Sequence, residues 1–387
     1  MQIKDTTHQY IMDTYARFPL TLVQGKGVYA YDEEGNDYID LGAGIGVNSL
    51  GFCNEGWTAA VAKQAATLQH VSNLYYTAPA AELAERLCAS GHFAKVFFGN
   101  SGAEANECAI KIARKHSCDH YNPERTEIIT LQDSFHGRTV TTLAATGQES
   151  FHKHFFPFTE GFVFAAPEID AVKKAIHENT CAIMLECIQG EGGVNILSEA
   201  FVQGVAALCK EHDLLLLVDE VQTGIGRTGT LFAHEQYGIQ PDIITLAKGL
   251  GGGLPIGACL CTEALKDVLG HGSHGSTYGG NPVACAGASY VLEQVTQPGF
   301  YEEVKEKGHY LAEKLRAIPG VASVRHKGLM LGVVLSDASA KEVAQKCLDH
   351  GLLVLTAKEI IRLLPPLTIT LDDIDEALTR FTRALRP

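Results

Sequence analysis

The chain has 387 residues, enough for two domains, and its 46% hydrophobic and 20% charged residues are ordinary for a globular protein. Acidic residues outnumber basic ones by 45 to 31, and the net charge of −14 argues against a nucleic-acid partner. No apolar run approaches the roughly 18 residues that cross a bilayer, and no secretory signal is expected. The eleven cysteines lack paired spacing, which favours a reducing, cytoplasmic compartment and predicts neither a disulfide framework nor a metal site.

The first part of the chain predicts a small hairpin, because residues 28–41 contain two short strand patterns around an Asp-Glu-Glu-Gly-Asn turn. From about residue 57, helical segments alternate with short apolar runs. Helices are expected near residues 57–68, 79–88, 101–116, 169–177 and 199–212. Strands are expected near residues 94–98, 127–131, 162–166, 181–186, 214–218, 242–247 and 256–261. This alternation predicts a mainly parallel α/β sheet covered by helices on both faces.

The C-terminal part has a different order of elements. A predicted helix at 282–295 is followed by a break at Pro298-Gly299. After the break, helices are expected near 301–317, 340–350 and 371–385, with strands near 321–325 and 329–335. This order predicts a smaller α+β domain, against which the N-terminal hairpin is expected to pack. The expected division is an N-terminal segment, a large domain and a small domain, at residues 1–50, 51–285 and 286–387.

Lys248 follows the predicted buried strand 242–247 and precedes a glycine-rich stretch, residues 249–253. Ligands of such sheets lie at the carboxyl ends of the strands. A desolvated lysine in that position can lose its proton and form a Schiff base with a carbonyl group. The stretch alone leaves a second interpretation open, a charged lysine in a solvated turn.

Two other strand ends carry groups that suit the same ligand. Ser101 and Gly102 open a helix, whose free N–H groups and dipole favour an anion such as a phosphate. Ser101 and Glu104 are equally compatible with a simple capping box. Asp219 follows another strand, where a carboxylate can keep a cationic nitrogen protonated or merely cap a helix or form an ion pair. With Lys248, these groups predict pyridoxal phosphate (PLP). Proteins bind this cofactor through a Schiff-base lysine and an acidic residue at the ring nitrogen.

The motif GIGRTG, residues 224–229, matches the glycine pattern of dinucleotide-binding proteins. Such a fingerprint should follow its strand at once and open a long helix. Here residues 219–223 intervene, and the following LFAHEQYG is too short for the crossover helix. The context therefore argues against an NAD-dependent oxidoreductase, which is the alternative from a different class of enzyme.

Together the motifs resemble the class III (subgroup II) PLP-dependent aminotransferases of fold type I, from about residue 25 to residue 369. The resemblance rests on SGAEAN, FHGRT, IQGEGG, DEVQTGIGRTG, LAKGLGGGLPIGA, GSTYGGNP and RLLPPLTI. Cys187 stands where the family commonly has proline, and Tyr278 where phenylalanine is commoner. The resemblance implies a seven-stranded, mainly parallel sheet in the large domain beside a smaller α+β domain.

The resemblance also implies which residues bind the cofactor. They are Ser101, Gly102, Ala103, Phe135, Glu186, Asp219, Val221, Gln222, Lys248 and Thr277. Lys248 is expected to bind the cofactor covalently and to move the reacting proton, and Asp219 to bind the pyridine nitrogen. Phe135 and Val221 are expected on the two ring faces. Thr277 is expected to reach the phosphate from a partner subunit.

Four further residues are expected to bind substrate: Arg138, Glu191, Ser276 and Arg362. By the resemblance, Arg138 receives a substrate carboxylate, with Ser276 nearby from the partner. Arg362 receives the α-carboxylate of glutamate. Its position in an otherwise apolar segment is also compatible with a second interpretation, a surface arginine on an edge strand. Glu191 is expected to neutralise Arg362 while a terminal amine is bound and to swing away when glutamate is bound.

The activity implied is that of a homodimeric ω-aminotransferase with its active site shared across the interface. Within the family, the chain is most similar to members that act on N2-acetyl-L-ornithine. The expected products with 2-oxoglutarate are N-acetyl-L-glutamate 5-semialdehyde and L-glutamate, a step of arginine biosynthesis. Ornithine, 4-aminobutyrate and succinyl-diaminopimelate are the competing donors. An aminomutase or a dialkylglycine decarboxylase would share Lys248 and Asp219.

Overall fold

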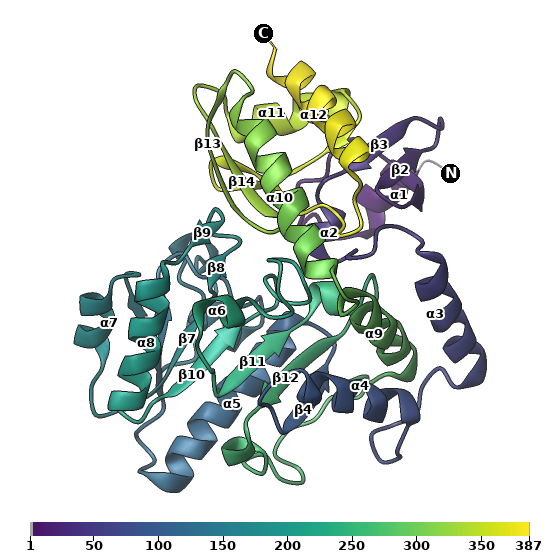
Figure 1. Cartoon of the computed structure of the whole chain (residues 1–387). Helices are drawn as coiled ribbons and strands as arrows, with labels where there is room; N and C mark the ends of the chain where they lie inside the picture. The colour runs from purple at the N-terminus through teal and green to yellow at the C-terminus, as the bar shows by residue number, and fades with distance from the viewer. Residues whose placement is uncertain (1–2, 387) are drawn as a thin grey trace.

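A seven-stranded sheet forms the centre of the larger, lower lobe in Figure 1, in a computed structural model that describes residues 3–386. The strand order is β4-β12-β11-β10-β7-β5-β6. The strands are β4 (Lys95–Gly99), β5 (Glu127–Leu131), β6 (Phe162–Ala165), β7 (Thr180–Leu185), β10 (Leu215–Asp219), β11 (Ile243–Leu246) and β12 (Gly257–Cys261). In this sheet β12 is antiparallel to both its neighbours, and the other pairings are parallel. The predicted mainly parallel sheet is confirmed.

Helices cover both faces of this sheet (Figure 1). They are α3 (Glu55–Thr67), α4 (Ala78–Ala89), α5 (Gly102–His120), α6 (Val140–Ala145), α7 (Ile169–Ala175), α8 (Glu199–Glu211) and α9 (Pro282–Val295). Single turns occur at α2 (Ala43–Gly46), η1 (Glu149–Phe151), η2 (Ala233–Tyr237), η3 (Lys248–Leu250) and η4 (Glu263–Leu265). Because the sheet is covered on both sides, every residue of β7 and β11 is buried. Helix α5 runs beyond the predicted end at residue 116, since no proline interrupts it before Pro123.

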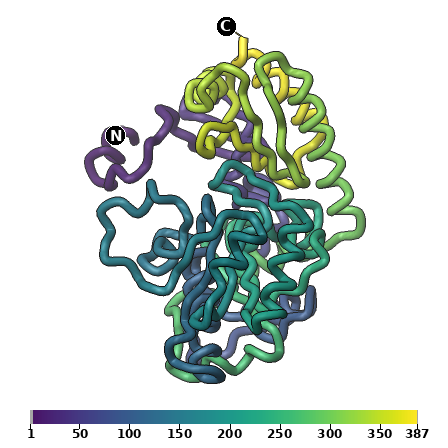
Figure 2. Tube along the Cα trace, turned by 90° about the vertical axis from the view of Figure 1, so that its left-hand side faces the viewer, coloured from purple at the N-terminus to yellow at the C-terminus, as the bar shows by residue number. Residues whose placement is uncertain are grey.

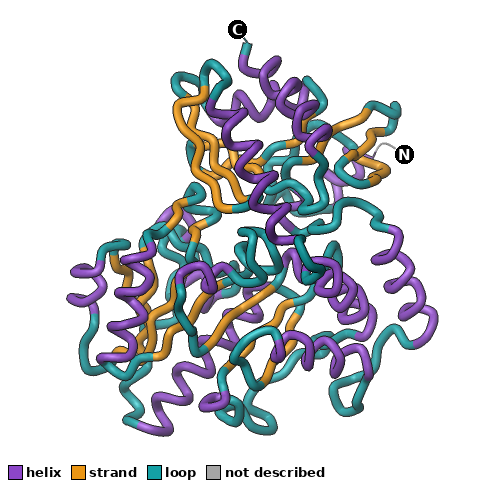
Figure 3. Tube along the Cα trace, viewed as in Figure 1, coloured by secondary structure: helices purple, strands orange, loops and turns teal. Residues whose placement is uncertain are grey.

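The smaller lobe contains an antiparallel sheet in the order β13-β14-β17-β16. Its strands are β13 (Val321–Lys327), β14 (Met330–Leu335), β16 (Leu355–Ala357) and β17 (Ile360–Leu363), and its helices are α10 (Phe300–Arg316), α11 (Ala340–Asp349) and α12 (Leu371–Leu385). Helix α12 buries Ile374, Ala377, Leu378, Phe381 and Ala384, an apolar stripe with helical spacing. Figure 3 shows the helices of this lobe packed beside its strands, which confirms the predicted α+β character.

The N-terminal segment joins the smaller lobe through strand pairing. It contains α1 (Ile3–Tyr10), β1 (Leu22–Lys26), β2 (Tyr29–Asp32) and β3 (Asp37–Asp40), and β3 pairs in parallel with β15 (Leu352–Leu353). The sequence predicted the β2–β3 hairpin but neither α1 nor β1. Figure 2 shows the start of the chain extending away from the two lobes. We propose the division into residues 1–50, 51–285 and 286–387 on the basis of these sheets.

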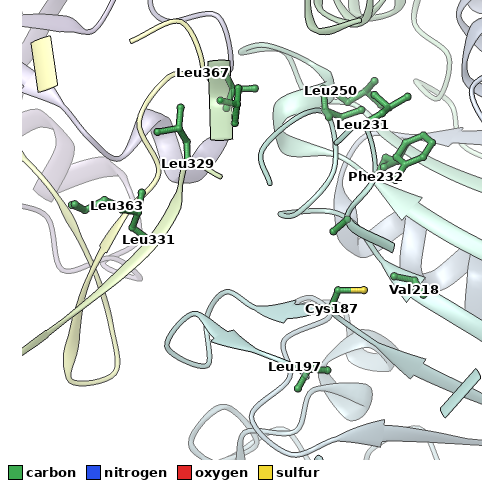
Figure 4. Close-up of a cluster of buried hydrophobic side chains, with 14 of the residues drawn as sticks. Cys187, Leu197, Val218, Leu231, Phe232, Leu250, Leu329, Leu331, Leu363 and Leu367 are labelled. Atoms are coloured by element: carbon green, nitrogen blue, oxygen red, sulfur yellow. The ribbon is translucent and has the colours of Figure 1, made fainter. Parts of the chain in front are cut away.

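One cluster of buried apolar side chains extends across both lobes. Buried side chains of the larger lobe, among them Leu231 and Leu250, belong to the same hydrophobic cluster as Leu329 and Leu367 of the smaller lobe. Figure 4 shows these leucines on the facing segments. Between the lobes lies a small hairpin, β8 (Ile188–Gln189) and β9 (Asn195–Ile196), which the sequence did not predict. Within residues 3–386, no helix is long and apolar enough to cross a membrane.

Truncation of Ile183 tests the packing of the central sheet. Ile183 is fully buried on β7, between β5 and β10. Ile183→Ala should lower the free energy of unfolding by about 2–5 kcal/mol, and Ile183→Val by about 1 kcal/mol, because the larger deletion leaves the larger cavity. Urea unfolding of the cofactor-free protein measures both. Equal costs for the two variants would contradict close packing at this position.

Candidate active site

A cavity of about 730 Å³ opens at the carboxyl ends of the parallel strands. Most of the predicted site residues line it, namely Ser101, Gly102, Ala103, Phe135, Arg138, Glu186, Asp219, Val221, Gln222 and Lys248. They follow five different strands, so the fold brings together residues that are far apart in the sequence. This is the place where sheets of this kind bind ligands.

Lys248 lies directly after β11, at the first position of η3, and is half-buried. Its backbone has φ of +42°, a conformation that residues other than glycine rarely adopt and that often marks a functional position. Burial lowers the pKa of its amine, against the opposing effect of the Glu191 and Asp219 carboxylates. A half-buried amine in a cavity fits covalent chemistry and does not fit a solvated turn.

Asp219 ends β10 and is held by a buried polar network. Its Oδ2 accepts a hydrogen bond from Asn106 Nδ2 at 2.8 Å and lies 2.9 Å from His136 Nδ1. Its Oδ1 accepts from the Val221 amide at 3.0 Å. Asn106 Oδ1 in turn accepts from Thr245 Oγ1 at 2.7 Å. The carboxylate is therefore held through both oxygens in the wall of the cavity.

His136 is a buried partner of Asp219. Burial opposes a charge on its ring, but the hydrogen bond and the negative charge of Asp219 outweigh burial and raise the pKa of His136. The sequence motifs assigned no role to Asn106 or Thr245. His136 stands beside Phe135 in the FHGRT motif, but its partner Asp219 is 83 residues away, so no local pattern shows the contact.

The N-terminus of α5 forms another wall of the cavity. Ser101 is the N-cap: its Oγ accepts from the Glu104 amide at 3.2 Å and donates to Glu104 Oε2 at 3.0 Å. Ser101 thus caps the helix as predicted, but the Glu104 carboxylate accepts from the amide of Asn100, at 2.9 Å, so the predicted capping box is not complete. The first residues of the helix, Gly102 and Ala103, line the cavity. A Cβ on Gly102 would lie 2.6 Å from Val221 Cγ1, so only glycine allows the helix to start here. Capping and anion binding are compatible.

Arg138 stacks on aromatic rings at the edge of the cavity. Its guanidinium carbon lies 4.0 Å from the centre of the Phe151 ring and 5.6 Å from that of Phe135. The Phe135 amide donates to Glu186 Oε2 at 3.0 Å. Burial raises the pKa of the Glu186 carboxyl group to about 7. Phe151 was not predicted as a site residue, because it stands in a loop with no motif of its own.

Arg362 and Glu191 form an ion pair next to the cavity. Arg362 Nη1 donates to Glu191 Oε1 at 2.7 Å and to Gln222 Oε1 at 3.4 Å, and Gln222 lines the cavity. Arg362 is only 2% exposed on β17, which lies between β14 and β16, so the interpretation as a surface arginine on an edge strand is wrong. Its Nε is buried without a hydrogen-bond partner among the described residues.

The hairpin that carries Glu191 is fixed from the smaller lobe. Glu191 lies between β8 and β9, and 26% of its side chain is exposed. Arg325 Nη1, on β13, donates to the Gly193 carbonyl at 2.9 Å and to Asn195 Oδ1 at 2.7 Å. The backbone around Glu191 is therefore held, while its side chain retains access to solvent.

Ser276 and Thr277 do not reach the cavity within one chain. Ser276 Oγ accepts hydrogen bonds from Asn100 Nδ2 and from the Gly279 amide, both at 3.0 Å, and Thr277 is exposed. Asn73 Nδ2 holds the same loop through the carbonyls of Ser276, at 3.1 Å, and Gly279, at 2.9 Å. The loop is thus ordered at the surface of the chain.

The residues around the cavity fit PLP. The Lys248 amine suits its aldehyde, the buried Asp219 carboxylate suits its ring nitrogen, and the N-terminus of α5 suits its phosphate. The parallel sheet with one antiparallel strand, together with this set of groups, defines a PLP-dependent transferase of fold type I.

The sequence pattern of the class-III aminotransferases matches residues 10–385, and the chain belongs to this PLP-dependent family. It is 50% identical to the acetylornithine aminotransferase of Haemophilus ducreyi, over 99% of this chain and 98% of that protein. Among solved structures, it is similar to N-acetylornithine aminotransferase from Stenotrophomonas maltophilia (36% identity, TM-score 0.86, 98% of both chains). It is also similar to ornithine aminotransferase from Toxoplasma gondii (31% identity, TM-score 0.94, 98% of this chain and 93% of that one). The predicted family, fold type and cofactor are confirmed.

The raised pKa of Glu186 predicts a pH dependence of stability. The folded chain keeps this proton at pH values where the unfolded chain has lost it, so the carboxyl group stabilises the fold at low pH. That contribution is lost as the pH rises from 4.5, its ordinary pKa, to about 7. Glu186→Gln should therefore gain stability relative to the wild type over this range. Urea unfolding of the cofactor-free proteins between about pH 5 and pH 8 checks this. A difference that stays constant with pH would contradict it.

Proposed function

We propose that the protein transfers the terminal amino group of N2-acetyl-L-ornithine to 2-oxoglutarate, forming N-acetyl-L-glutamate 5-semialdehyde and L-glutamate in arginine biosynthesis. The observation that carries the proposal is the Arg362–Glu191 ion pair beside a cavity that also holds Arg138. A site with one free arginine and one arginine paired to a displaceable glutamate suits two substrates of different charge. The names of the relatives described above support the choice of donor.

The proposed chemistry divides between the cofactor and the chain. PLP supplies, when bound, an aldehyde that accepts the amino group and a ring that withdraws electrons from the substrate carbon. Lys248 Nζ moves the proton at that carbon, and burial lowers the pKa of this amine, which favours its neutral form. Asp219, held in place by Asn106 and His136, would bind the ring nitrogen.

The remaining contacts orient the cofactor. Phe135 and Val221 line the cavity and are proposed to pack on the two faces of the ring. The backbone N–H groups of Gly102 and Ala103, with Ser101, are proposed to bind the phosphate at the start of α5. The further cavity residues proposed to contact the ring and its phenolic oxygen are Glu186 and Gln222.

The ion pair provides a way to alternate between substrates. While the terminal amine is bound, Glu191 neutralises Arg362, and Arg138 binds the carboxylate of the donor. When glutamate or 2-oxoglutarate binds, Glu191 moves away, Arg362 takes the α-carboxylate, and Arg138 takes the γ-carboxylate. The partial exposure of Glu191 gives its side chain room to move, while Arg325 keeps its backbone in place.

A homodimer would complete the site. Leu74, Tyr75, Tyr76 and Tyr278 are 86%, 68%, 106% and 62% exposed, an unusual set of large apolar side chains at the surface of one chain. Asn73 ties their two loops together. We propose that this surface meets a second copy of the chain and that Ser276 and Thr277 enter the cavity of that copy. A cytoplasmic location is proposed because all eleven cysteines are free.

Replacement of Glu191 tests the alternation. In Glu191→Ala, Arg362 stays charged and unpaired beside the bound amine, so the amine half-reaction should slow by about tenfold or more. The glutamate half-reaction should keep most of its rate, because it does not need Glu191. Single-turnover absorbance of the two cofactor forms measures both rates. Glu191→Gln, which keeps the shape and removes the charge, is the matched control and should behave in the same way. An unchanged ratio of the two rates would rule the switch out.

The choice of donor is tested by direct comparison. The PLP form is mixed separately with N2-acetyl-L-ornithine, ornithine, 4-aminobutyrate and succinyl-diaminopimelate, and conversion to the amine form of the cofactor is followed. We expect the highest kcat/KM for N2-acetyl-L-ornithine. Faster conversion by any of the other three amines would reject the proposed donor and leave the assignment as an aminotransferase intact.

A further inference from the structure

The motif GIGRTG contains a buried cation that the proposed chemistry does not use. Arg227 is 3% exposed, and within residues 3–386 it has no carboxylate partner. Its Nη1 donates to two backbone carbonyls, those of Leu329 at 3.0 Å and Pro365 at 2.5 Å. Its Nη2 is buried without a partner among the described residues. A buried guanidinium bound only to carbonyls is costly to desolvate, so stability alone does not explain it.

Both carbonyl partners belong to the smaller lobe. The contact is reciprocal at Leu329, whose amide donates to the Arg227 carbonyl at 3.0 Å. The turn before Leu329 approaches so closely that a Cβ on Gly328 would lie 2.6 Å from the carbonyl carbon of Thr228. A Cβ on Gly229 would likewise lie 2.5 Å from Cγ of Lys305. Gly229 of the motif thus makes room for a side chain of the smaller lobe, in the stretch where a dinucleotide fold would bind a phosphate.

The two carbonyls lie on the segments that carry Arg362. Leu329 immediately precedes β14, and in the register of β14 and β17 Gly332 is opposite Arg362. Pro365 follows β17, three residues after Arg362. Because β14 and β17 are antiparallel, Leu329 and Pro365 lie at the same end of this strand pair. Arg227 therefore fixes the end of the pair that is three residues from Arg362.

The other end of the same loop belongs to the cofactor site. The loop starts at Asp219, and its Gln222 accepts from Arg362 Nη1 at 3.4 Å. One short segment of chain thus holds the proposed partner of the ring nitrogen, contacts the side chain of Arg362 and binds the backbone three residues after it. Figure 4 shows Leu329 and Leu367 facing Leu231 and Leu250 across the same junction, so apolar packing supports the clamp.

We infer that Arg227 is a positioning residue for substrate binding. By holding the carbonyls of Leu329 and Pro365, it sets the place of Arg362 relative to Asp219 and thereby the affinity for the dicarboxylate substrate. The inference rests on the proposed role of Arg362 in binding the α-carboxylate. The amine donor does not contact Arg362 in that scheme, so its half-reaction depends little on Arg227.

The probe is glutarate, a dicarboxylate with the same chain length as 2-oxoglutarate but without the keto group that reacts. Its dissociation constant for the holoenzyme is measured by calorimetry. Arg227→Met fills the same volume without donors, and we expect it to weaken glutarate binding by about tenfold or more, since displacements of about 1 Å in such sites have effects of this size. Arg227→Lys retains one donor and should restore part of the affinity. The half-reaction with N2-acetyl-L-ornithine should change much less.

Arg125 provides the matched control. It is 8% exposed and donates through Nη2 to two backbone carbonyls, those of His212 at 3.2 Å and Asp213 at 2.7 Å, away from the cavity. Arg125→Met should leave the affinity for glutarate unchanged, even where its thermal unfolding resembles that of Arg227→Met. If Arg227→Met does not fold, Arg227→Lys provides the test. Weakened glutarate binding by Arg227→Lys supports the positioning role, and wild-type affinity contradicts it.

Arg362→Met separates the inference from the proposed function. If Arg362→Met loses glutarate binding and both Arg227 variants bind glutarate as the wild type does, Arg227 has no positioning role. If Arg362→Met itself binds glutarate with wild-type affinity, the proposed role of Arg362 is wrong and the inference fails with it. A loss in Arg362→Met and in Arg227→Met, with partial recovery in Arg227→Lys, supports both.

Discussion

The active site depends on a buried carboxylate whose two oxygens are both held by other parts of the fold. Asp219 is 4% exposed, and a buried polar group without hydrogen-bond partners is costly. Asn106 and the amide of Val221 donate to its oxygens, and His136 Nδ1 lies 2.9 Å from Oδ2. These partners come from α5, from the loop after β10 and from the loop after β5, so the position of one side chain requires that all three are assembled.

The other charges of the cavity are balanced around this carboxylate. Burial would strongly disfavour a charged Lys248, but Glu191 and Asp219 oppose that effect, so the amine keeps a partner when it is protonated and stays easy to deprotonate. Glu191 has a second partner, Arg362, at 2.7 Å. Because Glu191 acts on both cations, a movement of this one side chain changes the electrostatics of the lysine and of the arginine together.

The sequence predicted the residues that stand at strand ends and missed those that act through long-range contacts. Lys248, Asp219 and Ser101 each follow an apolar run, and parallel strands place their carboxyl ends together, so local patterns are enough to bring them to one site. Asn106 lies within α5 and looks like an ordinary helix residue until Thr245 and Asp219 are placed beside it. The antiparallel direction of β12 was also invisible, because GACLC has the same apolar pattern in either direction.

The glycine motif at residues 224–229 shows why a pattern needs its context. Glycine is required wherever two backbones approach closely, and the sequence does not tell whether the second backbone belongs to a ligand or to the protein itself. Here the approaching groups are the backbone of Gly328 and the side chain of Lys305. The arginine of the motif is consistent with that: a guanidinium facing a phosphate would be paired with an anion, whereas Arg227 faces two carbonyls at the junction of the lobes. The end of the motif that resembles a nucleotide fingerprint, from Arg227 to Gly229, therefore joins the lobe that lines the cavity to the lobe that carries Arg362.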